Sequence, residues 1–129
     1  MDFQMFASLP ASDLDRARSW YEKTLGATPT MEDPTGQALI YMSEDGTGFL
    51  VYRSEYAGTN EATAAGVGVA DFDAALSNLR SRGVTFEEYD FGDGMRTVDG
   101  VMADPTGRRS AWFKDSEGNI LALAENPTS

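Results

Sequence analysis

The chain has 129 residues, 41% of them hydrophobic, which suffices for one domain with a buried core. Its net charge is −11, from ten Lys and Arg against twenty-one Asp and Glu, and this charge disfavours nucleic-acid and membrane-surface partners because it repels phosphate groups. It contains no Cys and no His, which excludes disulfides, thiolate nucleophiles, catalytic imidazoles and metal sites that need either residue.

The first half of the chain predicts a strand, a helix and then further strands. The helix follows a β-like run over residues 3–9 and begins at Ser12 or Asp13, because the oxygens of such side chains cap the free amides of a first turn. Gly26 is the expected stop signal of this helix. The β-like runs that follow cover residues 28–32, 37–42 and 48–52.

The second half predicts the same order of elements. A β-like run over residues 62–69 leads into a helix that Asp71 caps and that ends at Gly83. The later β-like runs cover residues 85–89, 96–103, 109–114 and 119–124.

An internal repeat relates the two halves. Residues 12–19 align with residues 70–77 at a constant offset of 58, and the turn at Glu117-Gly118 matches the turn at Asp45-Gly46 at an offset of 72. Because two such copies complete one core, we expect a single domain over residues 1–129. Its two modules cover residues 1–57 and 61–126.

Two segments carry a resemblance to a known family. Residues 9–26, with the sequence LPASDLDRARSWYEKTLG, resemble the opening of a vicinal-oxygen-chelate domain, and residues 111–123, AWFKDSEGNILAL, resemble its last hairpin. That superfamily contains glyoxalases, bleomycin-resistance proteins and extradiol dioxygenases. The resemblance implies an α+β fold of two βαβββ modules, whose curled mixed sheet surrounds a cleft with the helices outside, commonly as a homodimer.

The resemblance also implies a metal ligand on the first and last strand of each module. The residues at these four positions are Phe6, Leu50, Ala64 and Ala122. None of these side chains coordinates a metal, and no shift of the alignment supplies an imidazole, so we expect neither a metal nor a cofactor. A Mg²⁺ or Ca²⁺ site built on carboxylates alone stays an open alternative. Its candidate residues are Glu87, Glu88, Asp90 and Asp93.

If the side chains at the four family positions face the cleft, strand alternation predicts which other side chains face it too. Short hairpin loops pair Ile40 with Leu50, Met42 with Gly48, Trp112 with Ala122 and Lys114 with Ile120. The predicted ligand-binding residues are Phe6, Ile40, Met42, Leu50, Tyr52, Ala64, Gly66, Trp112 and Ala122. Ordinary core packing is the competing interpretation, since a slip of one residue reverses every assignment on a strand.

Three functions follow from these residues. The preferred one is a metal-free protein, similar to the bleomycin-resistance branch, that binds a small aromatic or hydrophobic molecule, because apolar side chains favour binding over chemistry. The first alternative is a glyoxalase- or dioxygenase-like lyase, isomerase or oxygenase with a non-standard site; the second is a dimeric interaction module. No catalytic residue is predicted. The N-terminus shows no secretion signal and no apolar run reaches membrane-spanning length, so we expect a cytoplasmic protein.

Overall fold

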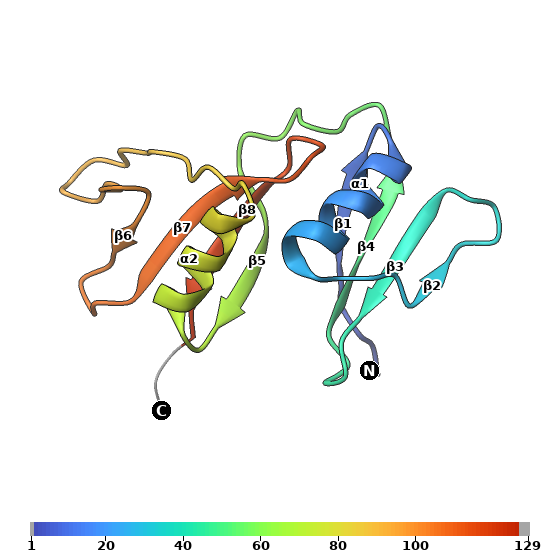
Figure 1. Ribbon diagram of the computed structural model, residues 1–129, viewed down its shortest axis with the longest axis horizontal. Coiled ribbons are helices and arrows are strands. Elements are labelled where there is room, and N and C mark those ends of the chain that lie inside the picture. The colour runs from blue at the N-terminus through green and yellow to red at the C-terminus, as the bar shows by residue number, and fades with distance from the viewer. Residues whose placement is uncertain (1, 127–129) are drawn as a thin grey trace.

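The computed structural model describes residues 2–126, which form two modules that lie side by side (Figure 1). The first module contains β1 (Ala7–Ala11), α1 (Leu14–Trp20), the π-helical turn η1 (Tyr21–Leu25), β2 (Met31–Glu32), β3 (Ala38–Met42) and β4 (Gly48–Arg53). The second contains β5 (Thr63–Val69), α2 (Phe72–Ser81), β6 (Met102–Ala103), β7 (Arg109–Lys114) and β8 (Ile120–Glu125).

Each module has its own four-stranded mixed sheet, with strand orders β1-β4-β3-β2 and β5-β8-β7-β6. The first strand of each sheet runs parallel to the last, and the other pairs are antiparallel. In Figure 1 both helices lie in front of the sheets, and β1 lies beside β5 where the modules meet. This arrangement confirms the α+β fold, although the strands form two sheets instead of one continuous curled sheet.

The predicted helix starts are confirmed. The Asp13 carboxylate accepts a hydrogen bond from the backbone amide of Arg16 at 3.0 Å, and Asp71 accepts one from Ala74 at the same distance. Both caps have extended backbone conformations, as N-caps require. Gly26 ends the first helical segment with a left-handed φ of 68°, which glycine adopts without steric cost. None of the described helices is long and apolar enough to cross a membrane.

Strand register follows the prediction in both hairpins. Ile40 pairs with Leu50 and Met42 with Gly48, while Trp112 pairs with Ala122 and Lys114 with Ile120. The alternate residues of these strands face the helices and form the core. Its members on the two hairpins are Leu39, Tyr41, Val51, Ala111, Phe113, Leu121 and Leu123.

Three predicted strand regions are wrong in whole or in part. The first strand begins only at Ala7, so residues 3–6 precede the sheet. Between α2 and β7, the predicted strand over residues 85–89 is absent, and residues 96–103 contribute only β6 and isolated bridges. Between residues 92 and 100, extended structure is interrupted because five residues have a positive φ: Gly92, Asp93, Gly94, Asp99 and Gly100.

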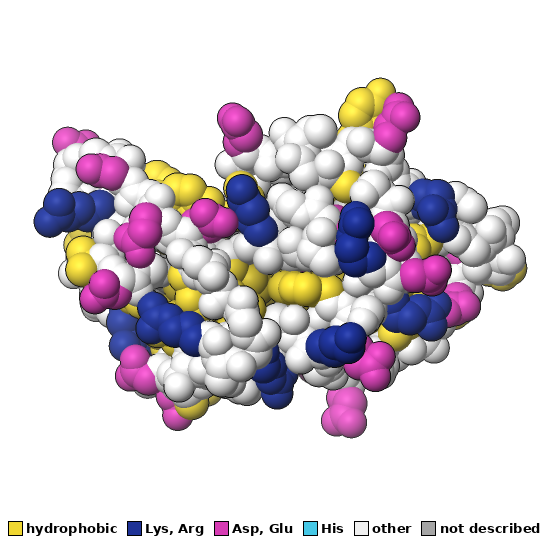
Figure 2. Space-filling model, turned by 45° about the horizontal axis from the view of Figure 1, so that its top comes forward, with side chains coloured by type: hydrophobic (Ala, Val, Ile, Leu, Met, Phe, Trp, Pro, Cys, Tyr) yellow, Lys and Arg dark blue, Asp and Glu magenta, His cyan; other side chains and the backbone are white. Residues whose placement is uncertain are grey.

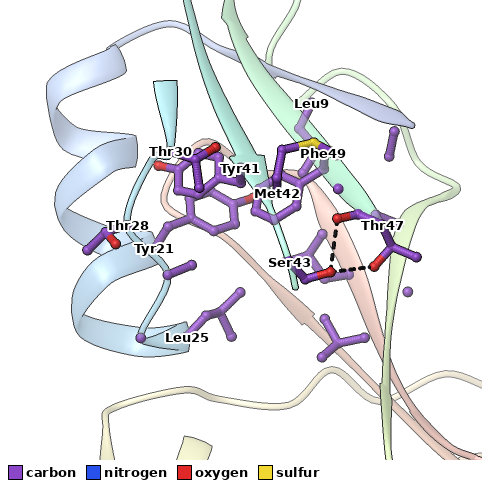
Figure 3. A pocket seen from close by; sticks show the side chains of 18 residues that line it. Leu9, Tyr21, Leu25, Thr28, Thr30, Tyr41, Met42, Ser43, Thr47 and Phe49 are labelled. Carbon is purple, nitrogen blue, oxygen red and sulfur yellow. Dashed lines mark hydrogen bonds between the residues drawn. The ribbon is translucent and has the colours of Figure 1, made fainter. Parts of the chain in front are cut away.

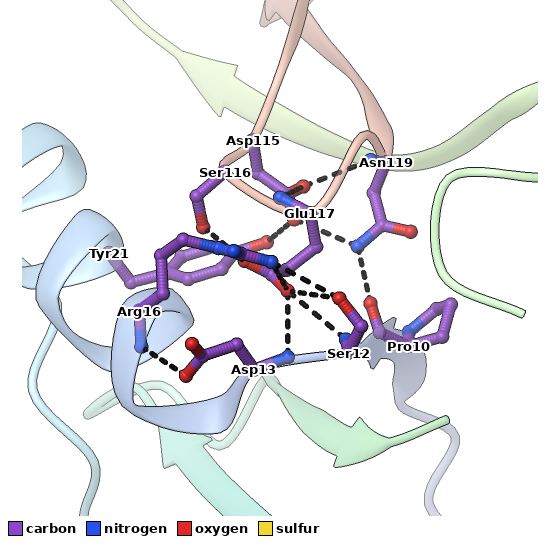
Figure 4. A network of polar contacts seen from close by, with 9 residues as sticks. All are labelled: Pro10, Ser12, Asp13, Arg16, Tyr21, Asp115, Ser116, Glu117 and Asn119. Atoms are coloured by element: carbon purple, nitrogen blue, oxygen red, sulfur yellow. Dashed lines mark hydrogen bonds and ion pairs between the residues drawn. The ribbon is translucent and has the colours of Figure 1, made fainter. Parts of the chain in front are cut away.

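The hairpin between β7 and β8 ties the second module to the first (Figure 4). The side chain of Glu117 in its turn is fully buried, and it accepts hydrogen bonds from the backbone amides of Ser12 at 3.1 Å and Asp13 at 3.0 Å. Arg16 forms an ion pair with the same carboxylate at 2.8 Å. Burial by itself raises the pKa of Glu117, but the hydrogen bonds from Arg16, Ser116 and Asp13 outweigh it and lower the pKa to about 2.

A second carboxylate in this hairpin is also enclosed by donors. Asp115 accepts hydrogen bonds from the Tyr21 hydroxyl at 2.6 Å and from the Asn119 side chain at 2.9 Å. The Asn119 amide also donates to the backbone carbonyl of Pro10 at 2.9 Å. These contacts join β1, η1 and the last hairpin, so this end of the boundary between the modules is closed by hydrogen bonds.

Candidate functional site

The face of the first sheet that is turned away from the helices is apolar and accessible to solvent; we call it the open face. Because Leu39 and Val51 point into the core, their strand neighbours Ile40, Leu50 and Tyr52 lie on this opposite face. Tyr52 is 37% exposed, and Met42, at the end of the same face, is 44% exposed. Exposed apolar surface is a common feature of ligand-binding and protein-binding sites, which makes this face a candidate site.

A cavity of about 170 Å³ lies on this open face. Four of the predicted site residues line it together: Phe6, Ile40, Met42 and Leu50. Gln4 and Met5, from the segment before β1, complete its edge. The structure therefore brings four of the five predicted residues of the first module together around one small hollow, and Tyr52 lies outside it.

The open face of the second sheet carries an aromatic cluster. Trp112 lies opposite Ala122, which in turn pairs with Gly66 of β5. The Trp112 ring contacts Tyr89 and Phe91, with centroids 5.8 and 5.5 Å away. Phe91 is 58% exposed, and the sequence alone did not single it out because it lies in the irregular segment before β6.

A β-bulge changes the predicted alternation along β5. Thr63 pairs with Ile120 and Ala65 with Leu121, so Ala64 is an extra residue between them. Ala64 packs against the core, and Thr63 takes the side of the sheet that Trp112 occupies, accepting a hydrogen bond from the indole N–H at 3.1 Å. The predicted place of Ala64 on the open face is thereby corrected, and Thr63 is a residue that sequence reasoning missed.

The residues at the family's metal positions do not fit a metal. Phe6, Leu50 and Ala122 have hydrocarbon side chains, and the bulge replaces Ala64 only with a Thr hydroxyl. Within residues 2–126, no group of three or more His, Cys, Asp or Glu side chains is placed to hold a metal ion. Of the acidic candidates, Glu88 accepts a hydrogen bond from the Thr97 hydroxyl at 2.8 Å, within its own segment.

A larger cavity lies on the other side of the first sheet, facing the helices (Figure 3). It has a volume of about 650 Å³ and opens where the two modules meet. Tyr21, Tyr41 and Phe49 supply its aromatic wall, and Ala65 and Val67 of β5 contribute from the second module. Of the predicted site residues, Met42 and Gly66 line this cavity, and neither cavity is lined by Tyr52, Ala64, Trp112 or Ala122.

The walls of both cavities are uncharged. Among the described residues that line them there is no Asp, Glu, Lys or Arg, although the chain as a whole carries 24% charged residues. In Figure 2 hydrophobic side chains gather near the middle of the face shown, and charged side chains spread over the rest of that face. An uncharged apolar molecule fits such walls, because an ion would lose its hydration there without gaining a partner.

The sequence matches the Glyoxalase/Bleomycin resistance protein/Dioxygenase superfamily over residues 4–123. A glyoxalase/bleomycin resistance protein from Catenulispora acidiphila is similar in structure, with a TM-score of 0.69 and 27% identity over 98% of this chain and 100% of that one. Lactoylglutathione lyase from Agrobacterium tumefaciens gives a TM-score of 0.71 at 17% identity, over 98% and 95% of the two chains.

A bleomycin-binding protein, solved in complex with bleomycin, gives a TM-score of 0.70 at 18% identity over 98% of this chain and 100% of that chain. A comparison with curated proteins gives no match. At this level of identity the last two structures show a shared fold, while the family match spans nearly all of the sequence. The chain belongs to the Glyoxalase/Bleomycin resistance protein/Dioxygenase superfamily.

Proposed function

We propose that this protein binds an uncharged aromatic or hydrophobic small molecule on its open faces without the help of a metal. One observation carries the proposal: hydrocarbon side chains, including Phe6 and Leu50, stand where the family's metal ligands are expected, and they line an uncharged hollow. Trp112 on the second sheet and Phe91, which packs against it, offer flat surfaces on which a ring system stacks. The bleomycin-binding relative is a precedent for small-molecule binding on this fold.

The proposal includes a homodimer, because the open face is too apolar to be left in water. Phe6, Met31 and Met42 are 59%, 58% and 44% exposed, and they lie on or beside one face of the first sheet. A second copy that places its own aromatic cluster over this face would bury these side chains and enclose a ligand between the two sheets. The small hollow of the first module thereby becomes one wall of a larger site.

The purified protein is expected to sediment as a dimer. Tyr52→Lys is expected to shift it toward the monomer, because it places a charge on the open face. Tyr56→Lys is the matched control, since Tyr56 is 70% exposed in the connector between the modules. A monomer at all concentrations, or an equal response to both substitutions, contradicts the proposed dimer.

A planar, uncharged aromatic ligand is expected to quench the fluorescence of Trp112. The measurement is a titration with flavones, naphthoquinones and similar compounds, and Trp112→Phe assigns the signal because Trp20 is the chain's other tryptophan. Ile40→Glu is expected to weaken binding about tenfold or more, since it puts a charge on an uncharged wall.

Gln37→Glu is the control for this experiment, because it adds the same charge at an exposed position just before β3. The proposal fails if no compound of the panel quenches Trp112, or if Ile40→Glu and Gln37→Glu bind with the same affinity. Conversion of a bound compound to a product would instead favour the enzymatic alternative.

A further inference from the structure

The two ends of the boundary between the modules are built differently, although the modules are repeats. The β3–β4 turn corresponds to the β7–β8 turn at an offset of 72, which places Asp45 where the other copy has Glu117. Glu117 reaches across to the start of α1. Asp45 instead accepts hydrogen bonds from Ser43 and Thr47 of its own turn, at 3.0 Å from the Thr47 backbone amide. Among the described residues, no hydrogen bond ties this turn to α2.

At this second end, the cavity of about 650 Å³ lies between η1, the β3–β4 hairpin and β5. The equivalent place in the second module is filled. The backbone amide of Ala27 donates to the carbonyl of Tyr21 at 3.0 Å, and the amide of Val84 donates to the carbonyl of Leu79 at the same distance. Ala27 therefore occupies the position at which the second module has the larger Val84. Two positions further along, Phe86 of the second module is 8% exposed and packs against Phe113, whereas the first module has a proline at that position.

The local backbone of the first module also differs beside the cavity. The offset between the two copies is 58 within the helices but 57 after them, because η1 contains one residue more than the end of α2. A π-helical insertion of this kind is less stable than regular α-helix and recurs at functional sites. Here it supplies two wall residues, Tyr21 and Leu25.

The aromatic wall of the cavity is held in place by its own contacts (Figure 3). Tyr41 and Phe49 are stacked, with centroids 4.6 Å apart and rings 4° from parallel. Tyr21 lies 5.4 Å from Phe49, and its hydroxyl is fixed by Asp115 at 2.6 Å. A rigid, flat and uncharged wall favours a ring system, because little side-chain freedom is lost on binding.

We propose that this cavity is a second binding site, which takes one uncharged molecule with fused aromatic rings. Its volume lies within the usual range for small-molecule sites, about 300–1,000 Å³. The hydroxyls of Thr28, Ser43 and Thr47 lie around it. Those of Ser43 and Thr47 already donate to Asp45, so they offer a single polar substituent of the ligand an acceptor. The site lies mainly on the helix side of the first sheet, whereas the smaller hollow lies on the open face, and the two share only Met42, Gly48 and Phe49 at the end of the hairpin. The inference goes beyond the proposed function.

N-Phenyl-1-naphthylamine, a neutral fluorescent probe with fused rings, is expected to bind the whole protein saturably in this cavity, and the variants below separate this binding from any on the open faces. Ala65→Leu is expected to weaken its binding at least tenfold, because the added side chain occupies the cavity from β5. Ala27→Val provides a second, milder filling, since it copies the residue that the second module already uses. It is expected to weaken binding about threefold.

Ala74→Leu is the matched control, because it adds the same side chain at an exposed position of α2. Its affinity for the probe is expected to equal that of the unmodified protein. Should Ala65→Leu fail to fold by circular dichroism, Ala27→Val decides the question. The proposal is overturned if the probe shows no saturable binding, or if a folded Ala65→Leu or Ala27→Val binds it as tightly as Ala74→Leu does.

Discussion

Replacing Glu117 with Gln is expected to lower the free energy of unfolding by about 3 kcal/mol, or roughly 10 °C in Tm. The carboxylate is fully buried and holds Arg16 together with the backbone amides of Ser12 and Asp13. An amide at this position keeps the shape but removes the charge, and its own N–H groups then face other donors. Urea unfolding and calorimetry at neutral pH measure the loss.

Asp45→Asn is the control for this substitution, because Asp45 is the equivalent turn residue and its hydrogen bonds stay within an exposed loop. Its change in Tm is expected to be only a few degrees. Equal changes in the two variants would show that the link between the modules does not depend on the Glu117 carboxylate.

The effect of Glu117→Gln is also expected to depend on pH. The pKa of Glu117 is about 2 in the folded protein and 4.5 when unperturbed, so the unfolded chain takes up this proton first as the pH falls. The stabilisation is therefore complete above about pH 5 and is lost progressively toward pH 2. The difference in unfolding free energy between the unmodified protein and the variant should shrink over this range, and a constant difference would contradict the prediction.

Removing two buried phenol hydroxyls is expected to change stability in opposite directions. Tyr21→Phe is expected to cost about 2 kcal/mol, because the Tyr21 hydroxyl donates to the buried Asp115 carboxylate at 2.6 Å. Tyr41→Phe is expected to stabilise the protein by about 1 kcal/mol, since the Tyr41 hydroxyl is buried without a hydrogen-bond partner among the described residues. Urea unfolding of both variants gives the comparison.

The physical difference between the two phenols is the presence of an acceptor. Burial raises the pKa of both, and at Tyr21 the neighbouring Asp115 charge raises it further, so each hydroxyl stays protonated at neutral pH. Each proton therefore needs an acceptor, and only Tyr21 has one among the described residues. A loss of stability in Tyr41→Phe as large as that in Tyr21→Phe would mean that the lost hydroxyl contact is not the cause.

The sequence predicted the features that obey local rules. The helix starts at Asp13 and Asp71 were predictable because an N-cap needs only a side-chain oxygen and a free backbone amide three residues later. Both groups lie within one short segment of the sequence. Hairpin register was predictable for the same reason, since a short turn containing Gly46 or Gly118 fixes which residues face each other. The four family positions then set the expected face of every strand.

Features that depend on distant parts of the chain were not predictable. Glu117 and Ser12 are 105 residues apart, and nothing in either segment names the other as a partner. The bulge between Thr63 and Ala65 lies in a run of small residues that carries no signal of its own. In the irregular segment after α2, Asp93 and Asp99 have a positive φ, a backbone conformation that residues other than glycine rarely adopt. The cavity on the helix side depends on how both modules meet.

The different hydrogen bonding of the two equivalent turns affects which positions of this protein tolerate substitution during evolution. The β7–β8 hairpin joins the two halves through Glu117, Asp115 and Asn119, whereas the described hydrogen bonds of Asp45 stay within its own turn. Substitutions near Asp45 are therefore expected to change which compound the proposed second site binds, while the contacts of Glu117 between the halves remain in place. The two repeats therefore differ in tolerance: substitutions in the Glu117 turn are expected to reduce stability, and substitutions in the Asp45 turn are expected to have little effect on it.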